Sequence, residues 1–448
     1  MASAVEQFAA NLNFGSFAKA EELKQRLWFT LGALIIFRIG TYIPLPGIDP
    51  HIWQQIFQQK SGGVLDMFDM FSGGALHRMS IFALNIMPYI SASIIIQLMT
   101  SMNPRLEAMK KEGEAGRKKL NQYTRYFTIV LSIIQAYGLA VGLENMQGQG
   151  GSAVISAGIF FRISTVITIV GGTIFLMWLG EQITARGVGN GTSLIIFSGI
   201  VAGIPRAVAG TLALGQEGAI STLTIIGMLF MVVAVVAFIV FMERAQRRVI
   251  VQYPKRMVGN RMSGGDSSHM PLKMNTSGVI PPIFASSLLL LPLTIVGFSG
   301  VGKGNDIMDS VARYLQHGQP AYMMLYGGLI VFFAFFYTAI VFNPDETAEN
   351  LRKYGGFVPG IRPGKSTADY LDYVLTRITV IGAMYLVFVC LLPELLIAKF
   401  SLPFYFGGTS LLITVSVMMD TVAQIHSHLI AHQYEGLIKK SKLRGSRK

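Results

Sequence analysis

Ten apolar stretches, long enough or nearly long enough to cross a bilayer as helices, constrain the fold of this chain more than any other feature. A membrane-crossing helix needs roughly 20 residues, because each residue advances the helix by about 1.5 Å. The stretches are Leu27–Tyr42, Ile81–Met102, Phe127–Leu143, Phe160–Leu179, Leu194–Leu214, Leu223–Met242, Val279–Phe298, Tyr322–Phe342, Ile378–Leu396 and Gly407–Ala423. The sequence therefore predicts an all-α protein with ten transmembrane helices.

Composition supports lipid as the solvent for most of the chain. Hydrophobic residues make up 52% of the 448 residues and charged residues only 14%, whereas soluble domains carry about 25% charged residues. The single cysteine, Cys390, lies within an apolar stretch. A disulfide framework within the chain is therefore excluded, and Cys390 is predicted to be a small buried hydrophobe.

The net charge of +13 fits either nucleic-acid binding or basic cytoplasmic connectors, and the positions of the charges decide between them. With ten spans, 29 of the 37 Lys and Arg residues fall on the side of the two termini and 7 on the other side. Arg38 lies near the end of the first stretch, where its long side chain is expected to reach outward. The asymmetry predicts cytoplasmic termini and needs no sequence-specific nucleic-acid binding.

Two connectors on the cytoplasmic side, Glu243–Lys273 and Asn343–Arg377, are longer than joining two helices requires. Both are rich in Arg, Gly or Pro, and long surface loops of this kind often carry function. A basic tail, residues 439–448, follows the last span. We interpret the two connectors as binding surfaces.

A short segment between the first two spans does not fit a plain helical bundle. Gly62-Gly63 and Gly73-Gly74 bracket Val64–Ser72, which has helical apolar spacing but is too short to cross a bilayer. One interpretation is an interfacial amphipathic turn. The other is a movable re-entrant segment, tolerated at membrane depth only where it is buried in protein or lines a cavity.

Motifs for catalysis, metals and cofactors are weak in this sequence. Gly364-Lys365-Ser366 resembles the end of a phosphate-binding loop, but the required glycine-rich cradle does not precede it. Acidic and basic residues are sparse in mid-span, which disfavours an ion-coupled transporter without excluding it. Three hypotheses thus stay open: a passive channel, an ion-coupled secondary transporter of small molecules, and an intramembrane enzyme.

Long strings of the sequence resemble the bacterial branch of the SecY/Sec61-alpha family of protein-conducting channels. They include GGALHRMSIFALNIMPYISASIIIQL (73–98), FLMWLGEQITARGVGNGTS (175–193), FFYTAIVFNPDETAENLRKYGGFVPGIRPG (335–364) and PFYFGGTSLLI (403–413). The resemblance implies two inverted five-helix halves, residues 1–214 and 215–438, around an hourglass pore. The pore would open sideways to lipid between the second and third spans and the seventh and eighth.

The resemblance also assigns residues to the pore, although isoleucine spacing alone indicates no pore. It places a constriction ring at Ile86, Ile90, Thr192, Ile196, Ile283 and Ile413. Thr192 stands where the family commonly has an apolar residue, so we expect a slightly wetter ring. A plug helix at about residues 62–74 would include Val64, Leu65, Met67, Phe68, Met70 and Phe71.

Partners and function follow from the same resemblance. The two connectors would dock the ribosome or the SecA ATPase through Arg247, Arg248, Lys255, Arg256, Arg261 and Arg362. Arg362 matches an arginine that the family needs for translocation, and Asn260 replaces one of two adjacent family arginines. The chain would work in the bacterial cytoplasmic (inner) membrane with the small subunits SecE and SecG. It would pass unfolded, signal-bearing preproteins and release hydrophobic segments into the bilayer, with no cofactor, metal or catalytic residue.

Overall fold

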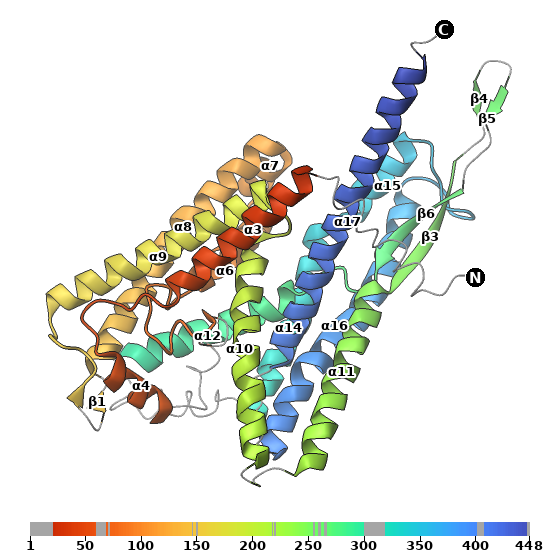
Figure 1. Ribbon diagram of the computed structural model, residues 1–448. Helices are drawn as coiled ribbons and strands as arrows, with labels where there is room; N and C mark the ends of the chain where they lie inside the picture. The colour runs from red at the N-terminus through yellow and green to blue at the C-terminus, as the bar shows by residue number, and fades with distance from the viewer. Residues whose placement is uncertain are drawn as a thin grey trace.

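The computed structural model describes residues 21–59, 69, 72–145, 147–148, 151–216, 218, 221–253, 256–258, 261–263, 267–299, 319–400 and 407–445. Long helices dominate this part of the chain (Figure 1). The ten helices that coincide with the predicted stretches are α3 Glu21–Gly40, α6 Met87–Met102, α8 Glu114–Asn145, α9 Ile159–Arg186, α10 Gly191–Gln216, α11 Thr222–Arg244, α12 Ile280–Ser299, α14 Pro320–Val341, α16 Lys365–Phe400 and α17 Gly408–Gly445. Shorter helices are α4 Pro50–Gln59, α7 Pro104–Lys111 and α15 Pro344–Lys353.

Length and composition qualify seven of these helices, within the described residues, as membrane spans: α8, α9, α10, α11, α14, α16 and α17. Helices α6 and α12 are apolar but shorter over their described parts. Helix α3 carries two acidic residues in its first turn and Arg38 in its last. The chain is therefore a polytopic helical membrane protein, and the total of ten spans stays a prediction.

The second predicted span begins later than the sequence indicated. Residues 81–86 lie in turns, and α6 starts only at Met87, with Ile86 at its N-cap and Pro88 in its first turn. A proline is tolerated there because the first N–H groups of a helix have no partner within the helix. Proline also occurs inside a helix, since α10 continues through Pro205.

One large hydrophobic cluster, called here the membrane core, joins most of these helices. Its buried members include Phe37 of α3, Ile169 of α9, Ile239 of α11, Ile330 of α14 and Leu386 of α16. Helix α12 packs against α6, α8 and α14, while α10 packs against α9 and α17. Helices far apart in sequence thus share a single core.

The connector Glu243–Lys273 folds as an antiparallel hairpin rather than an irregular loop. Strand β3 (Gln246–Gln252) pairs with β6 (Ser267–Lys273), and the short strands β4 (Arg256–Val258) and β5 (Arg261–Ser263) pair further out. A third small hairpin, β1 (Gln147–Gly148) with β2 (Gly151–Ser152), lies at the other end of the molecule (Figure 1). Alternating burial along β3 places Val249 and Val251 on one face.

The connector Asn343–Arg377 is also more ordered than predicted. It contains α15, and α16 already begins at Lys365, so residues 365–377 are helical. Helix α17 likewise runs to Gly445, through most of the predicted tail. Helix α16 starts early because buried side chains outside the membrane core, such as Leu371 and Leu375, give its first turns further packing.

A second, small hydrophobic cluster forms where the two connectors meet. It contains Val249, Leu272, Val358, Val374, Leu375 and Ile378. Gln252 and Phe357 exchange backbone hydrogen bonds of 2.8 and 2.9 Å across it. We call residues 246–252, 267–274 and 356–378 the hairpin unit. Figure 1 places it at the same end of the molecule as α7, α15 and the C-terminal end of α17.

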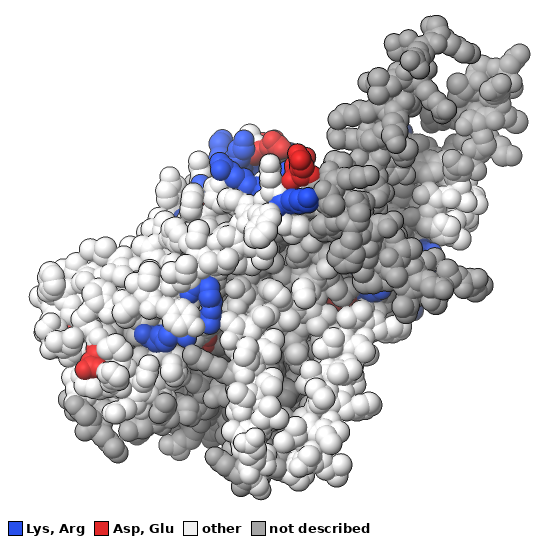
Figure 2. Space-filling view, viewed as in Figure 1, with Lys and Arg blue, Asp and Glu red and all other residues white. Residues whose placement is uncertain are grey.

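Charged residues gather unevenly on the visible surface. Figure 2 shows Lys and Arg, with Asp and Glu beside them, at the end of the molecule where α7 lies. Most of the described surface below that end is neither basic nor acidic. This pattern matches a helical body in contact with lipid and a charged end in water.

Candidate pore and docking surfaces

Five predicted ring residues belong to the membrane core. Ile86 and Ile413 are fully buried, Ile196 and Ile90 are buried, and Ile283 is partly buried against the same cluster. They come from the N-cap of α6 and from α6, α10, α12 and α17. The fold therefore brings residues from both halves of the sequence into one apolar region. Their convergence on a single constriction stays a prediction, because this cluster includes many other residues.

Thr192, the sixth predicted ring residue, has a hydroxyl that is already engaged. Its Oγ1 donates a 2.7 Å hydrogen bond to Asn190 Oδ1, which also accepts from the backbone N–H of Thr192 at 3.1 Å. Asn190 thus caps the start of α10. The hydroxyl of Thr192 donates its hydrogen to the cap of its own helix. This hydrogen bond limits the extra hydration of the ring that we expected from a threonine at this position.

The start of α10 lies directly against α9. The backbone N–H of Gly191 donates to Thr184 Oγ1 at 2.8 Å, and Thr184 Oγ1 donates to the carbonyl of Gly180 at 2.9 Å. A side chain at Gly191 would collide with that carbonyl. The close approach requires glycine and holds Thr192 in place.

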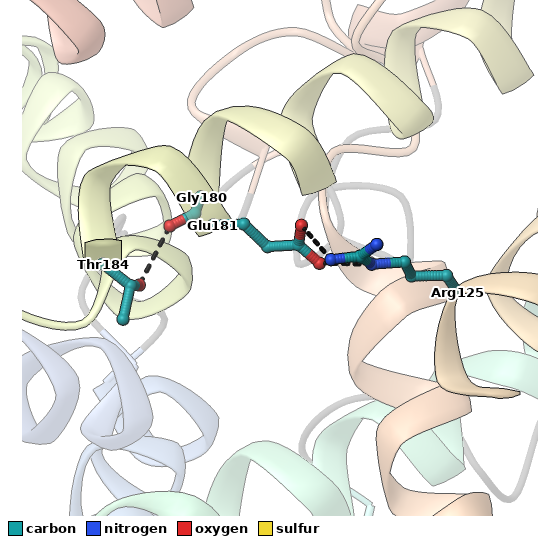
Figure 3. A network of polar contacts seen from close by, with 4 residues as sticks. All are labelled: Arg125, Gly180, Glu181 and Thr184. Carbon is teal, nitrogen blue, oxygen red and sulfur yellow. Dashed lines mark hydrogen bonds and ion pairs between the residues drawn. The ribbon is translucent and has the colours of Figure 1, made fainter. Parts of the chain in front are cut away.

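The same turn of α9 binds α8 through an ion pair. Glu181 and Arg125 point toward one another and form two parallel contacts, Nε to Oε1 at 2.8 Å and Nη2 to Oε2 at 2.7 Å (Figure 3). Bidentate pairing of a guanidinium with a carboxylate fixes both distance and orientation. Helix α9 therefore positions α8 on one side and the start of α10 on the other.

Direct contact between α6 and α12 occurs next to the predicted ring. Ser287 Oγ donates to Met87 Sδ at 3.9 Å, both side chains being buried. Met87 follows Ile86 in sequence, and Ser287 lies one turn after Ile283. The two helices thus meet within one turn of two predicted ring residues.

The predicted plug residues Val64, Leu65, Met67, Phe68, Met70 and Phe71 lie outside the described residues. The hinge that follows them is described. Gly73 and Gly74 have φ angles of +68° and +81°, which favour glycine. The carbonyl of Gly73 accepts from Arg38 Nη1 at 2.7 Å and from Arg78 Nη2 at 3.1 Å. Arg38 therefore reaches this hinge instead of snorkelling outward, because a buried carbonyl needs a donor.

Asp69 is the one residue described inside the predicted plug range before Ser72. Its carboxylate accepts from the backbone N–H of His77 at 2.6 Å, and Ser72 Oγ donates to its carbonyl at 3.0 Å. Burial raises the pKa of the Asp69 carboxyl, against the lowering effect of these neighbours. These hydrogen bonds link Asp69 to Ser72 and His77, on either side of the glycine pair.

Predicted docking residues lie on the hairpin unit and beyond it. Arg247 and Arg248 are exposed on β3, and Arg362 is exposed on the loop before α16. The backbone of that loop is held by Gly360 and Gly364, both with positive φ, and by Thr367 Oγ1, which donates to the Arg362 carbonyl at 3.0 Å. Arg256 and Arg261 lie in strands β4 and β5, and Lys255 is outside the described residues.

Comparison with known proteins assigns the family. The family model described as SecY matches residues 80–422. A protein named protein translocase subunit SecY from Rickettsia typhi is 56% identical over 425 residues, which cover 95% of this chain and 98% of the relative. The protein of the same name from Escherichia coli K12 is 55% identical over 95% of this chain and 96% of its own length.

The chain belongs to the SecY family.

Solved structures show that this SecY-family chain shares the fold of known channels. A structure described as that of a protein-conducting channel has a TM-score of 0.63 at 18% identity and covers 91% of this chain and 92% of its own. Sec61 in the canine ribosome-channel complex from the endoplasmic reticulum has a TM-score of 0.62 at 18% identity, with the same coverage. At this level of identity the likeness concerns the fold.

Sequence reasoning missed two features of this SecY-family chain. The run of β-branched residues in RVIVQ (248–252) was a signal for the strand that carries Val249 and Val251. The link between Arg125 and Glu181, separated by 56 positions, had no local signal, because nothing in one sequence indicates which distant charges face each other.

Proposed function

We propose that this chain is the pore-forming subunit of a channel that conducts unfolded, signal-bearing preproteins across the membrane and releases hydrophobic segments into it. The observation that carries the proposal is the identity of 55–56% over nearly the whole chain with relatives named protein translocase subunit SecY. Four buried isoleucines from both halves of the chain lie in one core, with Ile283 partly buried against it, which supports the proposal.

The pore would lie between the halves 1–214 and 215–438, with the ring at its waist and the plug at 62–74. An apolar ring excludes water when it is empty and adapts to diverse side chains when a polypeptide fills it. Packing of α12 against α6 and α8 would close the sideways exit. An apolar signal segment would favour opening, because the open exit gives it access to lipid.

Partners would supply the energy, so the chain itself would catalyse no reaction and hold no cofactor. The hairpin unit, with Arg247, Arg248 and Arg362 exposed, would dock the SecA ATPase or the ribosome. Solved relatives of this fold include channels in ribosome complexes from dog and yeast. SecE and SecG would complete the channel within the bilayer.

We place the protein in the bacterial inner membrane with both termini in the cytoplasm, as the charge asymmetry favours. Labelling of single cysteines in a Cys390→Ala background tests this orientation. Ser156→Cys should react with an impermeant reagent from outside intact spheroplasts, whereas Lys118→Cys should react only after lysis. Both positions are exposed, and the reverse labelling pattern would refute the orientation.

Reconstitution tests the function directly. The chain is purified with SecE and SecG, placed in liposomes and supplied with SecA, ATP and a precursor. Protease-protected precursor should appear only when both the motor and an intact signal peptide are present. Solute uptake driven by an ion gradient without the motor, and no precursor transport, would instead favour the secondary-transporter alternative.

A further inference from the structure

Residues 274–279 connect the hairpin unit to α12, and they bridge the two hydrophobic cores. Met274 packs against the small core, whereas Val279 and Ile280 pack against the membrane core. The backbone N–H of Met274 donates to the carbonyl of Ala245 at 2.9 Å, which extends the β3–β6 pairing by one step. The segment is thus a direct mechanical link between the proposed docking surface and the helix that carries Ile283.

Both polar atoms of the Asn275 side chain form hydrogen bonds that fix this connecting segment. Its Nδ2 donates to Glu243 Oε1 at 2.6 Å and to the carbonyl of Gly278 at 3.0 Å, while its Oδ1 accepts from Ser277 Oγ at 3.1 Å. Asn275 and Ser277 are each only 4% exposed. Because one hydrogen-bond partner is the end of α11 and another is the turn before α12, Asn275 joins the two helices.

Helix α16 closes the link from a third side. A side chain at Gly382 would lie 2.7 Å from the carbonyl oxygen of Met274, so the connector crosses α16 where glycine leaves room. Tyr385, one turn further along α16, is also buried. The connector is therefore confined by α11, α16 and its own turn.

We propose that Asn275 and Glu243 form a rigid joint that transmits docking at the hairpin unit to α12 and so to the contact between Ser287 and Met87. Both are positioning residues, and the proposal rests on the proposed function. A flexible connector would let the hairpin unit shift on docking without moving α12. A connector held by the three hydrogen bonds of Asn275 and confined by α11 and α16 makes the two move together.

The test separates docking from its transmission. Asn275→Ala removes all three side-chain hydrogen bonds. Thr276→Ala is the matched control on the same connector, since Thr276 Oγ1 donates to the nearby Lys273 carbonyl at 3.0 Å and not to α11 or to the turn before α12. Each variant is reconstituted with SecE and SecG, and three quantities are measured: SecA affinity, SecA-driven precursor transport, and disulfide formation between Met87→Cys and Ser287→Cys in a Cys390→Ala background.

In the parent, SecA should lower the yield of the disulfide between Met87→Cys and Ser287→Cys, because docking separates α6 from α12. Asn275→Ala should bind SecA within about twofold of the parent, yet lose about tenfold in driven transport and keep the disulfide unchanged on docking. Thr276→Ala should behave as the parent does. Normal transport by the Asn275→Ala variant would overturn the proposal. A loss of SecA affinity as large as the loss of transport would also overturn it.

A swap of hydrogen-bonding groups tests whether the bond itself matters. Asn275→Asp places two carboxylates against each other and should be at least as damaging as Asn275→Ala. Adding Glu243→Gln to Asn275→Asp restores the donor–acceptor pair between positions 243 and 275, although not the bond to the Gly278 carbonyl, and should recover part of the lost transport, which a general packing defect would not do. No recovery would overturn the joint, whereas a parent channel that fails to transport precursor would instead refute the proposed function on which it rests.

Discussion

The membrane core and the small core of the hairpin unit are both built from apolar side chains, but they differ in size and in structural role. The membrane core joins helices from α3 to α17 and buries isoleucines that local sequence does not distinguish from lipid-facing ones. The small core has six buried residues from one hairpin, one loop and one helix. The first can seal a path through the protein, whereas the second only has to hold a basic surface in a fixed shape.

The sharpest way to break this comparison is to make the membrane core polar. Ile86→Asn and Ile413→Asn each bury an amide at a fully buried position, at a cost of roughly 1–3 kcal/mol. That is enough to shift a closed state held by a few kcal/mol. We expect increased ion conductance in planar bilayers and export of precursors with defective signal peptides.

Ile134→Asn is the control for these ring variants, since Ile134 is exposed on α8. It should impair insertion or stability with little conductance. If Ile86→Asn and Ile413→Asn neither increase ion conductance nor allow export of precursors with defective signal peptides, the ring lies elsewhere in the core.

Reversing a charge on the hairpin unit should have the next largest effect and leave the seal intact. Arg362→Glu changes an exposed side chain on a loop whose backbone is already fixed. We expect normal membrane insertion and conductance with a severe loss of SecA-driven transport. Arg105→Glu, on the separate helix α7, should transport nearly normally. Undiminished transport by stably inserted Arg362→Glu protein would remove Arg362 from the docking surface.

Weakening the small core should loosen the hairpin unit alone. Leu375→Ala removes a buried side chain, and such changes cost about 2–5 kcal/mol. Because the unit is small, we expect faster tryptic cleavage after Arg247 or Arg248, measured by mass spectrometry, while ion conductance stays low. Ile381→Ala, at an exposed position of the same helix, should leave the cleavage rate unchanged. Faster ion leak in Leu375→Ala would mean that the two cores are not separable.

The smallest expected effect concerns the Arg125–Glu181 pair that positions α8 on α9. The side chains are 45% and 29% exposed, so solvent screening limits their coupling to about 0.5–1 kcal/mol despite the bidentate geometry. A double-mutant cycle with alanine, read from thermal unfolding in detergent, measures it. The Lys353–Glu349 pair, 65% exposed on both sides, should couple less. If the two ion pairs had equal coupling energies, the Arg125–Glu181 pair would not be what positions α8 on α9.

Local patterns in the sequence were sufficient for the helices, and the reason is the solvent. In lipid every backbone group must be satisfied within its own segment, so long apolar stretches have to be helical. The same reasoning failed at residues 81–86, where Asn85 adopts a φ of +49° and the chain turns before α6. It also missed the β3–β6 hairpin and the early start of α16, since both depend on packing outside the bilayer.

Composition, spacing and charge by themselves determined that this chain is a multi-pass helical membrane protein with two long connectors, of which Glu243–Lys273 is strongly basic. Resemblance to a family supplied the pore and docking roles. Only the tertiary structure decided that Arg38 turns to the Gly73 carbonyl, that Thr192 is held by Asn190, and that Asn275 links α11 to the turn before α12. These contacts join residues whose partners are set by how helices pack, and the pairing of distant polar groups leaves no periodic trace in the sequence.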